Sequence, residues 1–77
     1  MTVDQARELR TRGLVLSAEI LPNPSKSGGW FLTILDDTCK SYLIVDDQEQ
    51  VITVPTVDDM LGLVRTIGLR NVAIRLG

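Results

Sequence analysis

The strongest local signal in the chain is PTVDDMLGLVRTIG, at residues 55–68. Thr56 is a favourable helix N-cap, and Asp58 and Asp59 would place negative charge in the first turn, where the helix dipole stabilises it. Gly68 suits the position just after a helix, because glycine adopts the left-handed conformation needed there without strain. These features predict a helix that begins after Thr56 and ends before Gly68.

The two sides of this predicted helix differ in polarity. On a helical wheel, apolar residues occupy one arc, and polar residues with a glycine occupy the opposite arc. The apolar arc consists of Val57, Met60, Leu61, Leu63, Val64 and Ile67, and the other arc of Asp58, Asp59, Gly62, Arg65 and Thr66. We therefore expect the helix to pack with its apolar arc on one face of a sheet.

The segments before this helix have the composition of strands. Alternating or β-branched apolar residues predict strands at residues 14–21, 30–35, 41–45 and 50–54. One face of the first strand is expected to carry Leu14, Leu16, Ala18 and Ile20. Short turns between the later strands favour an antiparallel meander.

The two ends of the chain complete the predicted order. Thr2 and Gln5 have the spacing of a capping box, which predicts a first helix from Thr2 or Val3 to Arg12. Arg10 interrupts its apolar stripe, so we expect this helix to lie loosely on the surface. A last strand is expected at residues 72–76, from Val72 to Leu76. The chain is thus predicted to be a single α+β domain, residues 1–77, with the order α-β-β-β-β-α-β.

The amino-acid composition limits the classes of protein to which the chain could belong. The chain has 77 residues, of which 44% are hydrophobic and 23% charged, proportions that favour one folded domain over disorder. No apolar run approaches the roughly 20 residues of a membrane-spanning helix. The first residues lack the basic start and apolar core of a signal peptide. We therefore expect a cytoplasmic protein that does not bind membranes.

The residues that usually carry catalysis are scarce. The chain has no histidine and a single cysteine, Cys39, so it lacks the commonest general base and cannot form an internal disulfide. Lys40 beside Cys39 would favour a thiolate, but no residue is present to act as its base, and we interpret Cys39 as a turn residue. The loop Ser25–Gly29 has lysine, serine and glycine, but neither the order nor the following helix of a phosphate-binding loop.

Three pairs of aspartates are candidate ligands for Mg²⁺ or Ca²⁺. They are Asp36-Asp37, Asp46-Asp47 and Asp58-Asp59. We interpret the first two as turn residues and the third as a complement to the helix dipole. We therefore expect no catalytic residues, no metal site, no cofactor and no enzymatic activity.

Arginines and aromatic residues are the candidates for contacts with nucleic acid. Residues 36–59 hold seven acids against Lys40 alone, whereas six arginines lie toward the two ends of the chain: Arg7, Arg10, Arg12, Arg65, Arg70 and Arg75. These could contact phosphates or a protein partner, although a net charge of −2 disfavours a dedicated nucleic-acid binder. Trp30, Phe31 and Tyr42 could stack on bases, but we interpret them as core residues.

The central strands are apolar on both faces, while only one predicted helix is strongly amphipathic. The face left for another partner would carry Phe31, Leu35, Leu43 and Val45. Uncovered apolar faces usually mark interfaces, so we expect a homodimer or another protein partner at this face. The alternative is that the first helix covers it, with the aliphatic stem of Arg10 lying on apolar surface.

Three functions remain open on these grounds. The first hypothesis is a small non-catalytic interaction or regulatory module that acts as a homodimer or as a subunit of an assembly. The second is a nucleic-acid-binding accessory protein that uses the arginines. The third is a small metal-binding or enzymatic domain that uses the aspartates.

Overall fold

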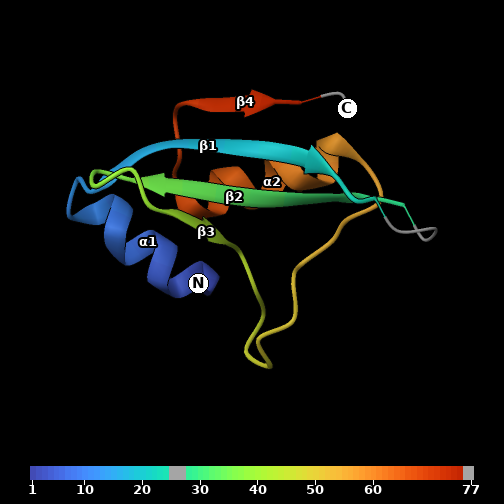
Figure 1. Ribbon diagram of the computed structural model, residues 1–77, viewed down its shortest axis with the longest axis horizontal. Helices are drawn as coiled ribbons and strands as arrows, with labels where there is room; N and C mark the ends of the chain where they lie inside the picture. Colours follow the sequence, from blue (N-terminus) through green and yellow to red (C-terminus); the bar gives the residue numbers. More distant parts are fainter. Residues whose placement is uncertain (25–27, 76–77) are drawn as a thin grey trace.

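A computed structural model describes residues 1–24 and 28–75 of the chain (Figure 1). Its elements are α1 (Val3–Thr11), β1 (Val15–Pro22), β2 (Trp30–Asp36), β3 (Ser41–Leu43), α2 (Val57–Ile67) and β4 (Val72–Ile74). The predicted α+β class is confirmed, with two helices and a four-stranded sheet in the order β3-β2-β1-β4. Ser25, Lys26 and Ser27 of the predicted loop, and Leu76 of the predicted last strand, lie outside the described residues.

Helix α2 forms as its sequence predicts. The Thr56 hydroxyl accepts a hydrogen bond of 3.1 Å from the Asp59 backbone N–H. Gly68 ends the helix in the left-handed conformation, with φ of 88°, and its N–H donates to the Val64 carbonyl oxygen. On the apolar arc, Met60, Val64 and Ile67 are buried, and Val57, Leu61 and Leu63 are partly buried against the same core.

The sheet combines antiparallel and parallel pairing. β1 pairs with β2, and β2 with β3, in antiparallel fashion, as a meander requires. β4 instead pairs with β1 in parallel, with Ala18 opposite Val72 and Ile20 opposite Ile74. The chain therefore returns through α2 to the edge of the sheet opposite to β3 (Figure 1).

The strand predicted at Gln50–Val54 is wrong. The segment forms only isolated bridges, from Val51 to Val45 and from Val54 to Trp30. Because β3 ends at Leu43, it does not pair with Trp30 at the start of β2. Val54 pairs with Trp30 instead, through two backbone hydrogen bonds of 2.8 and 3.0 Å. The segment crosses from one strand to another instead of forming a strand of its own.

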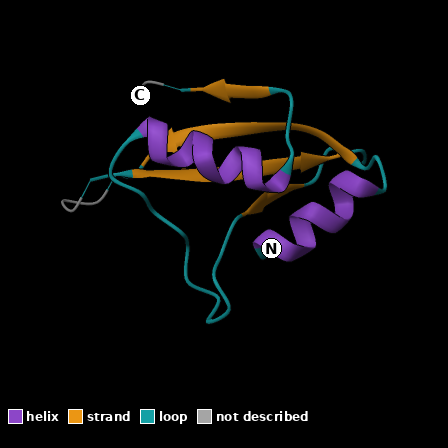
Figure 2. Ribbon diagram, turned by 180° about the vertical axis from the view of Figure 1, so that it is seen from behind, coloured by secondary structure: helices purple, strands orange, loops and turns teal. Residues whose placement is uncertain are grey.

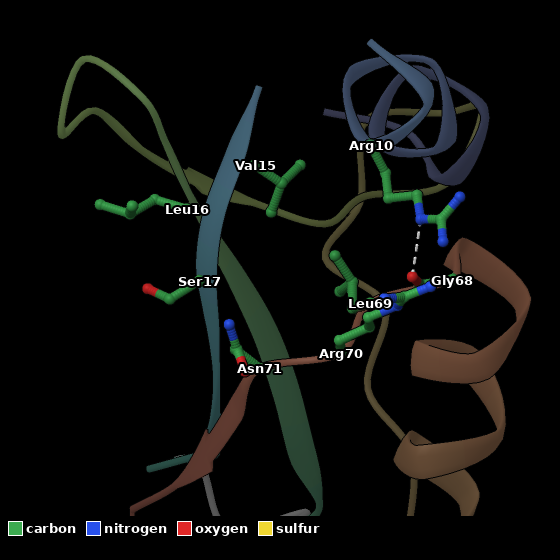
Figure 3. A pocket seen from close by; sticks show the side chains of 8 residues that line it. All are labelled: Arg10, Val15, Leu16, Ser17, Gly68, Leu69, Arg70 and Asn71. Carbon is green, nitrogen blue, oxygen red and sulfur yellow. Dashed lines mark hydrogen bonds between the residues drawn. The ribbon is translucent and has the colours of Figure 1, made fainter. Parts of the chain in front are cut away.

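The predicted position of Leu16 on the same face as Ala18 and Ile20 is also wrong. A β-bulge lies at this point, since Val15 is opposite Asp36 while Ser17 is opposite Leu35. A bulge adds one residue and reverses the alternation of side chains beyond it. Figure 3 shows Leu16 and Ser17 pointing away from the helices and Val15 pointing toward them, and Leu16 is 54% exposed.

Both helices lie on the same side of the sheet (Figure 2). α1 contacts α2, and Ala6 of α1 is fully buried in one core cluster with Met60 and Val64. The expectation of a loosely attached first helix is therefore wrong: a small residue, Ala6, lets the helix approach closely although its apolar stripe is narrow. Since α1 lies beside α2, it does not cover the opposite face of the sheet.

Candidate functional site

The face of the sheet turned away from both helices is the first candidate site. Its residues alternate along the strands with buried Ala18, Ile20, Leu32 and Ile34, and the cross-strand register brings them together. We call this surface the open face and define it by Ser17, Glu19, Leu21, Phe31, Thr33, Leu35, Ser41, Leu43 and Ala73. Three of the four predicted interface residues, Phe31, Leu35 and Leu43, are on it.

Part of the open face borders a shallow hollow of about 200 Å³. Phe31 and Leu43 line it together with Asn23, Val51 and Thr53. Leu43 is 43% exposed and Val51 40%, so neither side chain is packed into the core. Val51 was not predicted here, because its approach depends on the crossing of residues 50–54 that local sequence does not reveal.

Val45, the fourth predicted interface residue, lies apart from the others. It lines a different hollow, between the start of α1 and the turn that follows β3. Its backbone N–H donates to the Met1 carbonyl oxygen, and it forms bridges with Thr2 and Val51. The structure therefore places Val45 in the junction of the N-terminus with this turn.

Charge on the open face is balanced. Arg75 and Glu19 form an ion pair, with 2.9 Å between Nε and Oε2. Glu19 is the one ionisable residue among those that define the face, and Arg75 neutralises it at the β4 edge. The face as a whole thus presents apolar side chains, hydroxyl groups and one neutralised pair.

A second candidate site lies between the ends of the two helices and the sheet edge (Figure 3). It is a hollow of about 280 Å³, formed by Arg10 of α1, residues 15–17 of β1 and residues 68–71, which connect α2 to β4. We call it the arginine hollow, because Arg10 and Arg70 both line it. The Arg10 Nε donates a hydrogen bond of 2.8 Å to the Gly68 carbonyl oxygen and so holds this guanidinium in place.

The structure does not gather all six predicted arginines into one surface. Arg10 and Arg70 share the arginine hollow, whereas Arg75 pairs with Glu19. The remaining three, Arg7, Arg12 and Arg65, are exposed and do not line that hollow. Sequence alone gave no sign that Arg10 and Arg70 would meet, because sixty positions separate them and no local pattern links the two.

The three aromatic residues do not form a common stacking platform. Trp30 packs against the core, while Phe31, next to it in β2, points to the open face. Tyr42 is opposite Ile34, and the Lys40 Nζ lies 5.5 Å from the centre of its ring. The side chains of Trp30 and Phe31 therefore lie on opposite faces of the sheet. The prediction of a core residue is correct for Trp30 and wrong for Phe31.

The first aspartate of each of the first two pairs accepts hydrogen bonds within its own turn. Asp36 Oδ1 accepts hydrogen bonds from the Thr38 hydroxyl, the Thr38 N–H and the Lys40 N–H, at 2.7, 2.9 and 2.9 Å. Chiefly the Thr38 hydroxyl, and then the Lys40 N–H, lower the pKa of Asp36, because they stabilise the carboxylate more than the neutral acid.

Asp46 makes the same pattern in the next turn. Its Oδ1 accepts from the N–H groups of Gln48 and Gln50, at 2.8 and 3.0 Å. Within residues 1–24 and 28–75, no group of three or more histidine, cysteine, aspartate or glutamate side chains is placed to hold a metal ion. Cys39 is an exposed residue of the turn at residues 36–40.

Comparison of the chain with known protein families, curated proteins and solved structures gave no match. No helix within the described part of the chain has the length and apolar character to cross a membrane. The open face and the arginine hollow are therefore the two candidate functional surfaces of the described chain.

Proposed function

We propose that this chain is a non-catalytic interaction module that forms a homodimer through the open face. One observation supports the proposal above the others: both helices pack on the same side of the sheet, and no helix of the described chain packs on the opposite face. On that face Leu43 is exposed, and Phe31 and Leu35 are partly exposed. A sheet stays half solvated when its outer face is polar, but apolar outer faces usually contact a partner.

Charge favours a second copy of the same chain as that partner. In a two-fold dimer each face meets itself, so any net charge on it would repel its own image. Glu19 is neutralised by Arg75, and the other defining residues of the open face carry no charge. A strongly basic or acidic partner would find no complementary charge there.

The size of the open face sets the expected affinity. Four strands at their usual spacing span roughly 14 Å, and the seven residues of β2 span roughly 23 Å. β3 and β4 have only three residues each, so the open face is smaller than a rectangle of these dimensions. The area of the open face is therefore well below the roughly 800 Å² that each partner buries in a standard interface. This holds even when the surface of protruding side chains and of the neighbouring Leu16 and Val51 is included. We therefore expect a weak dimer, with a dissociation constant in the micromolar range.

Sedimentation equilibrium over about 10 to 500 µM protein tests the proposal. The expected result is a mass that rises from 8.5 kDa toward twice that value with concentration. Leu43→Glu should hold the mass at that of the monomer while circular dichroism stays unchanged, because Leu43 is exposed in the monomer and a buried unpaired charge opposes association.

Gln48→Glu is the matched control. It adds the same charge at an exposed residue of the turn after β3, away from the open face, and is expected to leave the mass curve unchanged. A constant mass of 8.5 kDa across the whole range would overturn the proposal.

A further inference from the structure

We infer that the arginine hollow binds a phosphoryl group, held between the guanidinium groups of Arg10 and Arg70. This inference does not require the homodimer: the hollow borders the open face at Ser17, but neither Arg10 nor Arg70 is among the residues that define that face. It rests on the charge of the hollow, on the fixed position of Arg10 and on the space available.

The hollow concentrates positive charge. Arg10 and Arg70 are its two charged lining residues, and no acidic side chain lines it. Two guanidinium groups at one concave site repel each other unless an anion lies between them, so the site is complementary to a doubly charged ligand. The chain as a whole is acidic, which makes this local excess of cations a property of the fold and not of composition.

Arg10 is positioned in advance of binding. Its Nε is engaged by the Gly68 carbonyl oxygen at 2.8 Å, which leaves the four N–H bonds of the two Nη atoms for a ligand. A guanidinium held at one edge loses less freedom when the other edge binds, and its planar donors match pairs of phosphoryl oxygens. Within the described residues, the side chains of Arg70 and Asn71 have no hydrogen-bond or ion-pair partner, so their donors are also available.

The dimensions suit a phosphoryl group with part of the molecule that carries it. The hollow holds about 280 Å³, and a second hollow of about 400 Å³ adjoins it along the β1–β4 seam. The two share Ser17, Arg70 and Asn71, and the second also reaches Glu19 and Ala73 of the open face. Glu19 lines that second hollow, but its carboxylate is paired with Arg75. A monocarboxylate would neutralise only one of the two guanidinium groups, so the dianion is the better match.

Titration of the ¹⁵N-labelled protein with inorganic phosphate tests the inference. At constant ionic strength, set with sodium chloride, we expect saturable amide shifts at residues 15–17 and 68–71, with a dissociation constant on the order of millimolar. Arg70→Gln should weaken binding about tenfold, the loss expected for one charge-assisted interaction, and should leave the fold intact because Arg70 is exposed.

Arg7→Gln provides the matched control. It removes the same charge from an exposed residue of α1 that does not line the hollow, and it should leave the affinity unchanged. Equal weakening by the two variants, or shifts that chloride alone reproduces, would overturn the inference. An absence of saturable shifts up to about 50 mM phosphate would also overturn the inference, because binding that weak would not indicate a specific site.

Two further titrations identify the source of the phosphoryl group. A nucleoside monophosphate that binds more tightly than inorganic phosphate, with added shifts along residues 72–73, would assign the second hollow to the rest of a small ligand. A single-stranded oligonucleotide that binds more tightly, with steep loss of affinity between two salt concentrations, would assign the site to a nucleic-acid backbone. Phosphate alone, with no gain from either, would define a site for the free anion.

Discussion

The side chain of Arg10 in α1 donates its Nε hydrogen bond to the carbonyl oxygen of Gly68, the residue that caps α2, at 2.8 Å. This contact ties the ends of the two helices together on one side of the sheet. Gly68 has a φ of 88°, and a Cβ atom at this residue would lie 3.1 Å from the Arg10 Nε. The backbone conformation therefore favours glycine, and a Cβ atom would also make the Arg10 side chain move by a few tenths of an ångström.

Gly68→Ala is expected to lower the free energy of unfolding by about 1–2 kcal/mol, because a left-handed conformation strains residues that carry a Cβ atom. Urea denaturation followed by circular dichroism measures the loss. Gly62→Ala is the matched control in the same helix, since Gly62 is exposed in right-handed helix and a Cβ atom added there would have no neighbour within 4 Å. It should raise stability by about 0.5–1 kcal/mol. Equal effects of the two substitutions would contradict this account of the cap.

Two adjacent residues of α2 are expected to differ in their contribution to the core. Met60 is fully buried, whereas Leu61 is only partly buried. Met60→Ala should cost about 2–5 kcal/mol, because truncation leaves a cavity among residues that cannot collapse fully. Leu61→Ala should cost less, because water already reaches part of that side chain. The same denaturation experiment compares them, and a larger loss for Leu61→Ala would place the helix in a different rotation.

Local patterns in the sequence predicted α2 almost to the residue, because N-cap, apolar arc and C-terminal glycine all lie within one segment. The capping box likewise predicted the start of α1: the Thr2 hydroxyl accepts from the Gln5 N–H, and the Gln5 side chain accepts from the Thr2 N–H. What the sequence predicted poorly depends on contacts between distant segments. The crossing of residues 50–54 follows from where β3 ends, and the turned position of Leu16 follows from a bulge that no residue type announces.

The candidate sites also differ in how far local sequence patterns predicted them. Alternation in β2 and β3 predicted Phe31, Leu35 and Leu43 on one face, because a period of two is a local property. It failed for Val45, which lies beyond the end of β3 and joins the N-terminal residues. The arginine hollow was not predicted, because Arg10 and Arg70 are brought together only when both helices pack on the same side of the sheet.

The stability of the fold is expected to fall at acid pH partly through Asp36. Its pKa is lowered in the folded protein, mainly by the Thr38 hydroxyl and the Lys40 N–H. The stabilisation from this carboxylate is therefore complete above its unfolded pKa of about 3.9 and is lost as the pH falls through the lower folded value. Asp36→Asn should lose less stability than the wild type between about pH 6 and pH 2, measured by urea denaturation at each pH.

Asp37→Asn controls for the removal of one negative charge from the same turn. The Asp37 carboxylate accepts none of the hydrogen bonds made to Asp36, so this variant removes the charge and keeps those bonds. If Asp36→Asn and Asp37→Asn had identical pH profiles, the hydrogen bonds to Asp36 would not be a source of acid sensitivity.

The turns at residues 36–40 and 46–50 share one geometry, and it predicts where the chain is strained. In each turn an aspartate accepts from the backbone N–H groups two and four residues later, and the residue three positions after it is left-handed. Those left-handed residues are Cys39, with φ of 64°, and Glu49, with φ of 63°. Neither is a glycine, so each carries the steric cost of a Cβ atom in this region.

Cys39→Gly and Glu49→Gly are each expected to raise the free energy of unfolding, by about 0.5–1 kcal/mol, since relief of left-handed strain exceeds the added entropy of glycine in the unfolded chain. Both side chains are exposed, so neither substitution opens a cavity. Cys39→Ala and Glu49→Ala are the controls: they remove the same side-chain groups but keep the Cβ atom, and they should leave stability nearly unchanged. The side-chain hydrogen bonds of each turn stay within that turn, so the gains should add in the double glycine variant. Thermal and urea denaturation measure both, and a loss of stability on either glycine substitution would mean that the thiol or the carboxylate makes a contribution larger than the strain it imposes.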